Sequence, residues 1–172
     1  MAATTLSKCT STELETLLKI AKATFVETFG HLNDPAHFDA YVAKAFTLAQ
    51  FEKELSTPGS DFYLLRVDGH AAGYLKLNFP PAQSDLNEPQ SMEIERIYLY
   101  NQYQGSGLGK LLFNKAMEEA ANAEVKYIWL GGWEKNEKAI RFYESRGFYK
   151  FAKHPFKLGD DLQSDDLMRL DL

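Results

Sequence analysis

The residues that could carry chemistry gather where an apolar run, 92–99, leads into a glycine-rich turn, Gln104 to Lys110. Apolar residues then recur at helical spacing, which predicts a strand, a turn and a helix in succession. Glycines let a ligand approach the backbone, and the unpaired N–H groups that begin a helix favour an anion such as phosphate. Lys110 adds positive charge at the same end. This segment therefore indicates phosphate binding, the alternative being a simple tight turn.

The apolar run contains a break in its alternation. Under a strict period of two, Met92 and Ile94 share one face of the strand. Ile97 and Leu99 share the opposite face. Such a slip is usually absorbed by a β-bulge. We expect the bulge at Glu95, in preference to a strand that is buried on both faces.

Two common phosphate-binding loops do not fit this turn. The dinucleotide fingerprint requires G-x-G-x-x-G, and the P-loop requires a glycine five residues before its Gly-Lys pair and Ser or Thr after it. Here Gln104 occupies that glycine position and Leu111 follows Lys110. The sequence matches neither motif.

The turn resembles the Gln/Arg-x-x-Gly-x-Gly/Ala signature of the GNAT superfamily of acyl-coenzyme A N-acyltransferases, through Gln104, Gly107 and Gly109. The resemblance implies that acetyl-CoA is the co-substrate and that the turn binds its pyrophosphate. It also implies a bulged strand that splays from its neighbour, so that the pantetheine arm can lie between them. The binding residues implied are Ile97, Tyr98, Leu99, Gln104, Gly105, Ser106, Gly107, Leu108, Gly109, Lys110, Asn136, Lys138 and Tyr143.

A second constellation lies in the predicted helix 136–146. Asn136 and Tyr143 are seven residues apart, which places them within roughly 20° of each other on one helix face. By itself, a tyrosine on an inward helix face is usually part of a core. The segment resembles the second motif of the same family, N-x-x-A-x-x-F-Y. That resemblance implies that Asn136 contacts the pantetheine and that the Tyr143 hydroxyl stands near the coenzyme sulfur.

Acetyl transfer from a thioester to an amine sets three chemical requirements. The ammonium, whose free pKa is near ~10, must lose a proton, the oxyanion must be stabilised by backbone N–H groups, and the thiolate must gain a proton. Tyr143 is the candidate acid. Glu95 is the candidate base, acting directly or through water, and Glu93 is the alternative. Either carboxylate could instead pair with Arg96 or Lys76 for a purely structural purpose.

Other chemistries have weaker support. Cys9 has no His or Asp at a recognisable spacing, so we expect direct transfer and not an acyl-cysteine intermediate. The four histidines, His31, His37, His70 and His154, lack metal-ligand spacing, and we expect no metal.

The composition predicts one globular domain, 1–172, with 45% hydrophobic and 13% aromatic residues. No apolar segment is long enough for a membrane span, no signal peptide is recognised, and a single cysteine excludes an internal disulfide framework, so we expect a cytoplasmic protein. The net charge of −5 and the lack of a basic cluster argue against nucleic acid as a partner. The acidity is compatible with a cationic substrate, and also with ordinary solubility.

Periodicity and capping signals predict the remaining elements. We expect a strand at 4–9, helices over 14–29, from Pro35 and over 47–55, a hairpin at 62–67 and 70–79, a polar loop at 80–91, a strand at 125–133, and closing strands at 148–156 and 167–172 around a turn at 159–161. The loop could be a mobile rim of the site or a plain surface connection. This order resembles the GNAT fold, an α/β (α+β) architecture whose mixed central sheet has about six to seven strands, a splayed, bulged central parallel pair and flanking helices.

The acceptor amine is less sharply defined. The run 127–136 and a tail that includes Gly159, Gln163, Asp165 and Met168 resemble the bacterial polyamine acetyltransferases, which implies spermidine or spermine as substrate. Other small primary amines, and a protein N-terminus or lysine, are alternative acceptors. A non-catalytic acyl-CoA-binding module is an alternative function. The closing strands could also pair in a homodimer. Acidic residues that could hold a polycation in the rim of the site are Glu27, Asp85, Glu88 and Asp160.

Overall fold

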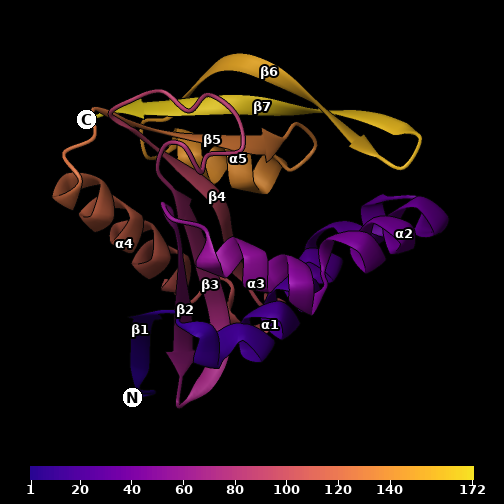
Figure 1. The fold of residues 1–172 in the computed structure, drawn as a ribbon, viewed down its shortest axis with the longest axis horizontal. Helices are drawn as coiled ribbons and strands as arrows, with labels where there is room; N and C mark the ends of the chain where they lie inside the picture. Colours follow the sequence, from indigo (N-terminus) through magenta and orange to yellow (C-terminus); the bar gives the residue numbers. More distant parts are fainter.

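A computed structural model describes residues 1–172. Seven strands form one mixed sheet in the order β1-β2-β3-β4-β5-β7-β6, in which only β4 and β5 run parallel (Figure 1). This confirms the predicted sheet with its central parallel pair. The strands are β1 Thr4–Lys8, β2 Ser60–Val67, β3 His70–Asn78, β4 Ser91–Leu99, β5 Tyr127–Trp133, β6 Tyr149–Leu158 and β7 Asp161–Asp171.

Five α-helices flank the sheet, and their starts follow the signals in the sequence. Thr10 and Glu13 form the predicted capping box just before the first helix, and Asp34 caps the second. At Thr47 only half of the expected box forms, because the Gln50 side chain donates to Glu54 at 2.9 Å. The helices are α1 Leu14–Phe29, α2 Pro35–Ala45, α3 Leu48–Ser56, α4 Leu108–Asn122 and α5 Glu137–Glu144.

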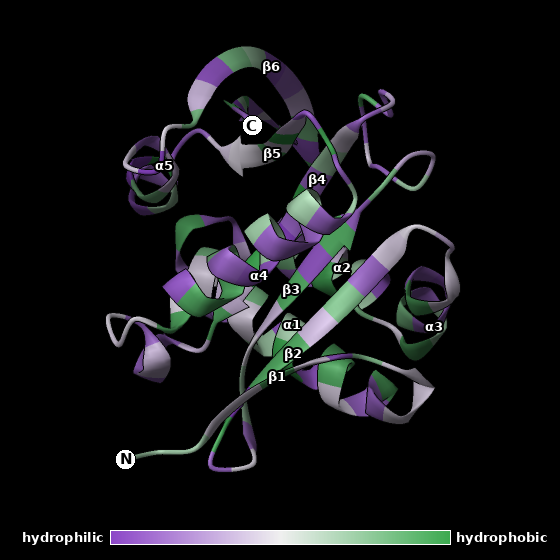
Figure 2. Cartoon of the chain, turned by 90° about the vertical axis from the view of Figure 1, so that its left-hand side faces the viewer, coloured by the Kyte–Doolittle hydropathy of each residue, from purple (hydrophilic) through white to green (hydrophobic).

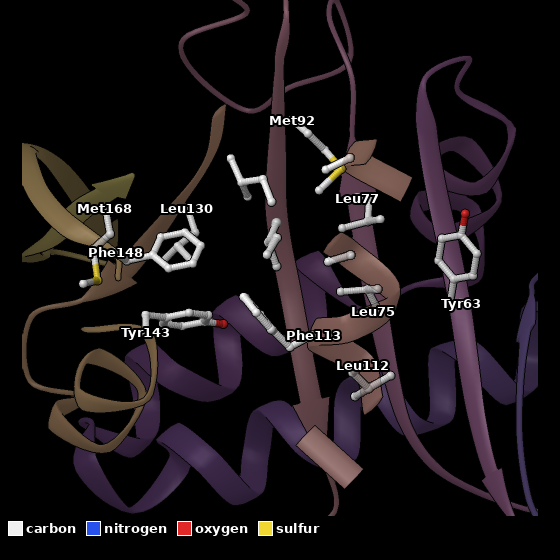
Figure 3. Packing of buried hydrophobic residues seen from close by; sticks show 14 of the residues in the cluster. Tyr63, Leu75, Leu77, Met92, Leu112, Phe113, Leu130, Tyr143, Phe148 and Met168 are labelled. Atoms are coloured by element: carbon white, nitrogen blue, oxygen red, sulfur yellow. The ribbon is translucent and has the colours of Figure 1, made fainter. Parts of the chain in front are cut away.

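The two faces of the sheet carry separate cores, as the alternation of β2 requires. Phe62 and Leu64 pack with α1 and α3 on one face. Tyr63 and Leu65 belong to the core on the other face, with residues of α4 and α5 (Figure 3). Figure 2 shows α4, with its alternating hydrophilic and hydrophobic bands, lying across the middle strands. Helices α1 and α3 therefore cover one face and α4 and α5 the other.

The predicted bulge lies in β4. Lys76 of β3 pairs with Arg96, but the next residue, Leu77, pairs with Ile94, so Glu95 is the extra residue. β4 also separates from β5, its neighbour on the other side. It pairs with β5 only over residues 91–93, and Figure 1 shows β5, β6 and β7 running at a wide angle to β2 and β3. The expected splay is confirmed, and it leaves the edge of β4 that faces β5 without a backbone partner after Glu93.

The closing hairpin differs from the prediction. β6 extends to Leu158 and β7 begins at Asp161, six residues before the expected start. The segment 161–166 is polar, so no apolar alternation marked it as a strand. Its backbone is held in place by β6 on one side and, from Asp165 onward, by β5 on the other. The structure contains no helix long and apolar enough to cross a membrane.

Candidate active site

The glycine turn presents a row of unused donors. From Gly105 to Gly109, five successive backbone N–H groups donate to no backbone carbonyl. Gly105 and Gly107 have φ values of +77° and +84°, and a Cβ built on either meets nothing within 4 Å. A left-handed backbone of this kind favours glycine. The turn therefore has unpaired N–H groups and open surroundings at the positive end of the α4 dipole, which suits an anion.

A second helix brings positive charge to this turn. Lys138 of α5 donates from Nζ to the side-chain oxygen of Gln104 at 2.6 Å, although the two residues lie 34 positions apart. Lys110 stands in the first turn of α4. Two of the predicted cofactor-binding residues are thus in contact, and two lysines belong to the segments that meet at the turn. The donor set fits a pyrophosphate.

Tyr143 lies on the same face of the sheet as the glycine turn. Its ring is 7% exposed, and Figure 3 shows the hydroxyl pointing from α5 toward β4. Burial, reinforced by Tyr98, raises the pKa of Tyr143, and no protein group forms a hydrogen bond with its hydroxyl. The phenol therefore stays protonated at neutral pH, as a proton donor must. Asn136 caps α5, accepting from the Ala139 N–H at 3.3 Å.

The opposite face of the sheet holds a cavity of about 880 Å³. Its walls come from α1, α2 and α3, from strands β3 to β7, and from the loop of residues 79–90. Tyr98 of β4 lines this cavity, and it is also among the groups that raise the pKa of Tyr143. The stretch of β4 that has no backbone partner on its β5 side therefore lies between the cavity on one face and the glycine turn and Tyr143 on the other.

Glu95 belongs to a network of paired charges in the cavity wall. Lys76 Nζ lies 2.5 Å from Glu95 Oε2 and 2.9 Å from Glu54 Oε2. Arg96 lies 2.8 Å from Glu54 and 3.6 Å from Glu95. Burial raises the pKa of Glu54, but Arg96 and Lys76 outweigh it and lower the value to about 2. Glu54 of α3 was not among the predicted site residues, because nothing local distinguishes it from a surface glutamate.

Glu93 differs from Glu95 in having no cationic partner. It is 2% exposed and accepts hydrogen bonds from Asn78 Nδ2 at 2.9 Å and from the Ser84 N–H at 2.8 Å. The Ser84 hydroxyl also donates to it. Burial raises the pKa of Glu93 above that of an ordinary glutamate. Asn78 Nδ2 donates to Glu95 Oε2 as well, at 2.7 Å, and so bridges the two candidate bases.

The polar loop of residues 79–90 is fastened to the sheet beside the cavity. Gln83 accepts from Trp129 Nε1 at 3.0 Å and donates to Ser91 Oγ at 3.0 Å. Ser84 and Asp85 line the cavity. The loop therefore contributes to the rim of the site, which was one of the two alternatives considered for it.

Only one of the four predicted rim acids lines the cavity. Asp85 does, and its carboxylate lies 2.6 Å from His154 Nδ1 on β6. Glu27 instead accepts from the Asn101 N–H, Glu88 accepts from the Tyr127 hydroxyl, and Asp160 is exposed in the β6–β7 turn. Asp165, which was named in the tail but not as a rim acid, does line the cavity.

The alternative nucleophile lies outside the site. Cys9 is buried in the core between α1 and the sheet, and burial raises its pKa to about 12. Its thiol is therefore protonated at neutral pH. No group of three or more His, Cys, Asp or Glu side chains is placed to hold a metal ion.

Comparison with known proteins identifies the family and the fold. The model of the acetyltransferase (GNAT) family matches residues 14–148. An uncharacterized N-acetyltransferase in the pepI 3′ region of Lactobacillus delbrueckii subsp. lactis is 44% identical over 157 residues, which cover 91% of each chain. The spermine/spermidine N(1)-acetyltransferase of Bacillus subtilis is 29% identical over 85 residues, 49% of this chain and 56% of that protein. The crystal structure of the PaiA N-acetyltransferase of Thermoplasma acidophilum in complex with coenzyme A has a TM-score of 0.80 at 18% identity, with 99% of both chains covered.

Proposed function

The chain belongs to the GNAT family of acetyltransferases, and on that premise we propose that it moves an acetyl group from acetyl-CoA directly to the primary amine of a polyamine such as spermidine or spermine. The observation that carries this proposal is the separation of β4 from β5 after Glu93. The separated stretch lies between a glycine turn with unused N–H donors on one face of the sheet and an aromatic, carboxylate-lined cavity on the other.

We assign the coenzyme to the glycine turn and to the gap beside β4. Unpaired N–H groups from 105 to 109, with Lys110 and Lys138, would hold the pyrophosphate. The pantetheine arm would follow the free edge of β4 past Ile97, Tyr98 and Leu99 toward Tyr143, with Asn136 at the start of α5. The PaiA structure in complex with coenzyme A supports this placement at the level of the fold.

The chemical step requires a proton to leave the acceptor and another to reach the coenzyme sulfur. The amine lone pair attacks the thioester carbonyl carbon, and the resulting oxyanion is stabilised by N–H groups on the unpaired edge of β4. When the C–S bond breaks, Tyr143 gives its proton to the thiolate. Its raised pKa supports this role, because the hydroxyl is protonated at working pH.

Two carboxylates compete for the role of base. Glu95, at the bulge, is our first assignment, acting directly or through water, although Lys76 holds it in an ion pair. Glu93 is the alternative, because it lacks a cation and its pKa is raised. Asn78 binds both, so a proton taken up by one changes the charge beside the other.

A polycationic acceptor is supported by the charge of the cavity and by the partial similarity to the Bacillus enzyme. Another small primary amine is the second candidate, and a protein N-terminus or lysine the third. A non-catalytic module has less support, since Glu95, Asn136 and Tyr143 are all present. The cytoplasmic location and the homodimeric state of the protein are still predictions that rest on the sequence.

The test is release of coenzyme A thiol from acetyl-CoA in the presence of spermine, spermidine, putrescine, a lysine peptide or no amine. Stimulation by the polyamines above the amine-free rate is the expected result. Stimulation by the peptide alone would move the acceptor to proteins. Coenzyme binding by calorimetry without stimulation by any amine would contradict the catalytic proposal for this set of acceptors.

A further inference from the structure

Asp165 stands out among the charged residues of the cavity because it has no partner. Its neighbour Asp166 is paired with Lys150, and Asp85 with His154, whereas Asp165 forms no ion pair and accepts no hydrogen bond. It is partly buried on β7, where burial raises its pKa. A carboxylate that is removed from water without a cation costs free energy, and an incoming cation would repay that cost.

The charges inside the cavity are unbalanced in a specific way. Five carboxylates line it: Glu54, Asp85, Glu93, Glu95 and Asp165. Arg96 and the neighbouring Lys76 pair with Glu54 and Glu95, and Asp85 lies beside His154. Glu93 and Asp165 have no cation within ion-pair distance. The two lysines of the lining, Lys44 and Lys157, are exposed. The interior therefore has room for two positive charges at two separate places.

The two places belong to one cavity. Glu93 lies on β4 and Asp165 on β7, and both line the cavity together with Tyr41 and Tyr98. A flexible molecule with two ammonium groups could reach both walls.

The surroundings of Asp165 are suited to an ammonium group. In the β5–β7 ladder Asp165 lies opposite Trp133, so both side chains leave the same face of the sheet. Gly131 precedes Trp133 on that face, and a Cβ built there lies 3.7 Å from Asp165 Oδ2, so the glycine keeps the approach open. Aromatic rings attract cations through their faces. The cavity is lined by ten aromatic side chains: Phe25, Phe29, Phe38, Tyr41, Phe46, Tyr74, Tyr98, Trp129, Trp133 and Phe156.

We propose that Asp165 and the aromatic side chains around it form a second cation subsite, which binds a distal ammonium of the acceptor while its reacting amine lies near Glu93 and Glu95. The subsite rests on the proposed acetyltransfer and makes it more specific. It selects acceptors with at least two positive charges, and it makes Asp165 a determinant of specificity that takes no part in the chemical step.

The test compares Asp165→Asn with the wild-type enzyme on two acceptors with the same four-carbon chain, 1,4-diaminobutane and butylamine, and on spermidine. Asparagine keeps the shape of aspartate and removes the charge. We expect kcat/KM for spermidine and for the diamine to fall about tenfold or more, the scale of one charge-assisted hydrogen bond, mainly through KM. The rate with butylamine should change less than about twofold, which also shows that the variant is folded. Asp160→Asn is the matched control, because that aspartate is exposed in the same hairpin.

Two results would overturn the subsite. One is an equal loss of kcat/KM for the monoamine and the diamine in Asp165→Asn. The other is no loss of kcat/KM for either amine. If no amine is acetylated at all, the subsite can still be tested by calorimetry, which measures the binding of spermidine to the enzyme in the presence of coenzyme A. Weaker binding to Asp165→Asn than to wild type and Asp160→Asn supports the subsite even though the proposed catalysis has failed. Identical binding to all three proteins rejects it.

Discussion

Lys76 Nζ lies 2.5 Å from Glu95 Oε2, so the carboxylate at the bulge of β4 is held in an ion pair. The pair does not remove Glu95 from the cavity, which its side chain lines. It keeps the carboxylate in one position beside the splayed edge of β4. Glu93, two residues earlier, has no such partner. The two candidate bases can therefore be separated by their pH dependence.

We predict that Glu95→Gln lowers kcat by about 10²-fold or more, the range of general-base catalysis, and flattens the acid side of the pH–rate profile. A base must be deprotonated, so the wild-type rate should rise with pH through the pKa of the base. Glu93→Gln is the matched comparison. Because burial raises the pKa of Glu93, a base at that position would give a rise above the usual range for glutamate. An unchanged profile in Glu95→Gln and a flattened one in Glu93→Gln would reassign the base.

Tyr143→Phe tests the acid. Removal of the hydroxyl should lower kcat by about 10²-fold or more and leave the coenzyme Kd nearly unchanged, because the ring and its packing remain. The raised pKa of Tyr143 keeps the wild-type phenol protonated across the neutral range. Steady-state rates with spermidine and calorimetry with coenzyme A measure the two quantities. Wild-type activity in this variant would remove Tyr143 from the acid role.

Gly107→Glu tests the anion site. The substitution puts a side chain and a negative charge beside the unpaired N–H groups before α4, so coenzyme binding should be lost. Gly69→Glu is a close control, since Gly69 has a φ of +81° and open surroundings like Gly107 at +84°, but lies in the β2–β3 turn. Both variants carry similar backbone strain. Equal coenzyme affinity in the two, measured by calorimetry, would contradict the assignment.

Glu54→Gln tests the buried charge network through its effect on stability. Loss of one partner of a mostly buried pair should lower the free energy of unfolding by about 3 kcal/mol at pH 7. The folded-state pKa of about 2 lies below the unfolded value, so the stabilisation is present above about pH 4.5 and is lost as the pH falls toward 2.

Thermal unfolding of Glu54→Gln at pH 7 and at steps between 4.5 and 2 provides the measurement. The Tm difference from wild type should be largest at pH 7 and should shrink over the acidic steps. Glu52→Gln serves as the control, because Glu52 is exposed on the same helix, and its Tm should follow wild type throughout. A Tm difference that does not change with pH would show that Glu54 acts through packing and not through its charge.

The sequence alone determined the features that depend on neighbours along the chain. The slip in apolar alternation located the bulge at Glu95, because side chains alternate along a strand and an extra residue must reverse them. The glycine-rich segment 104–110 predicted a turn before a helix, and Thr10 with Glu13 predicted a cap. Each of these rests on backbone geometry within a few residues, which periodicity can report.

Only the tertiary structure decided which charges meet. Glu54 is 42 residues from Arg96, and Asp165 reaches the cavity because β7 lies between β5 and β6 in the sheet. Local patterns could not identify these residues, because a glutamate on a helix and an aspartate in a polar strand look the same whether solvent or another chain segment faces them. Whether a carboxylate is paired, like Glu54, or left without a partner, like Asp165, depends on segments that only folding brings together.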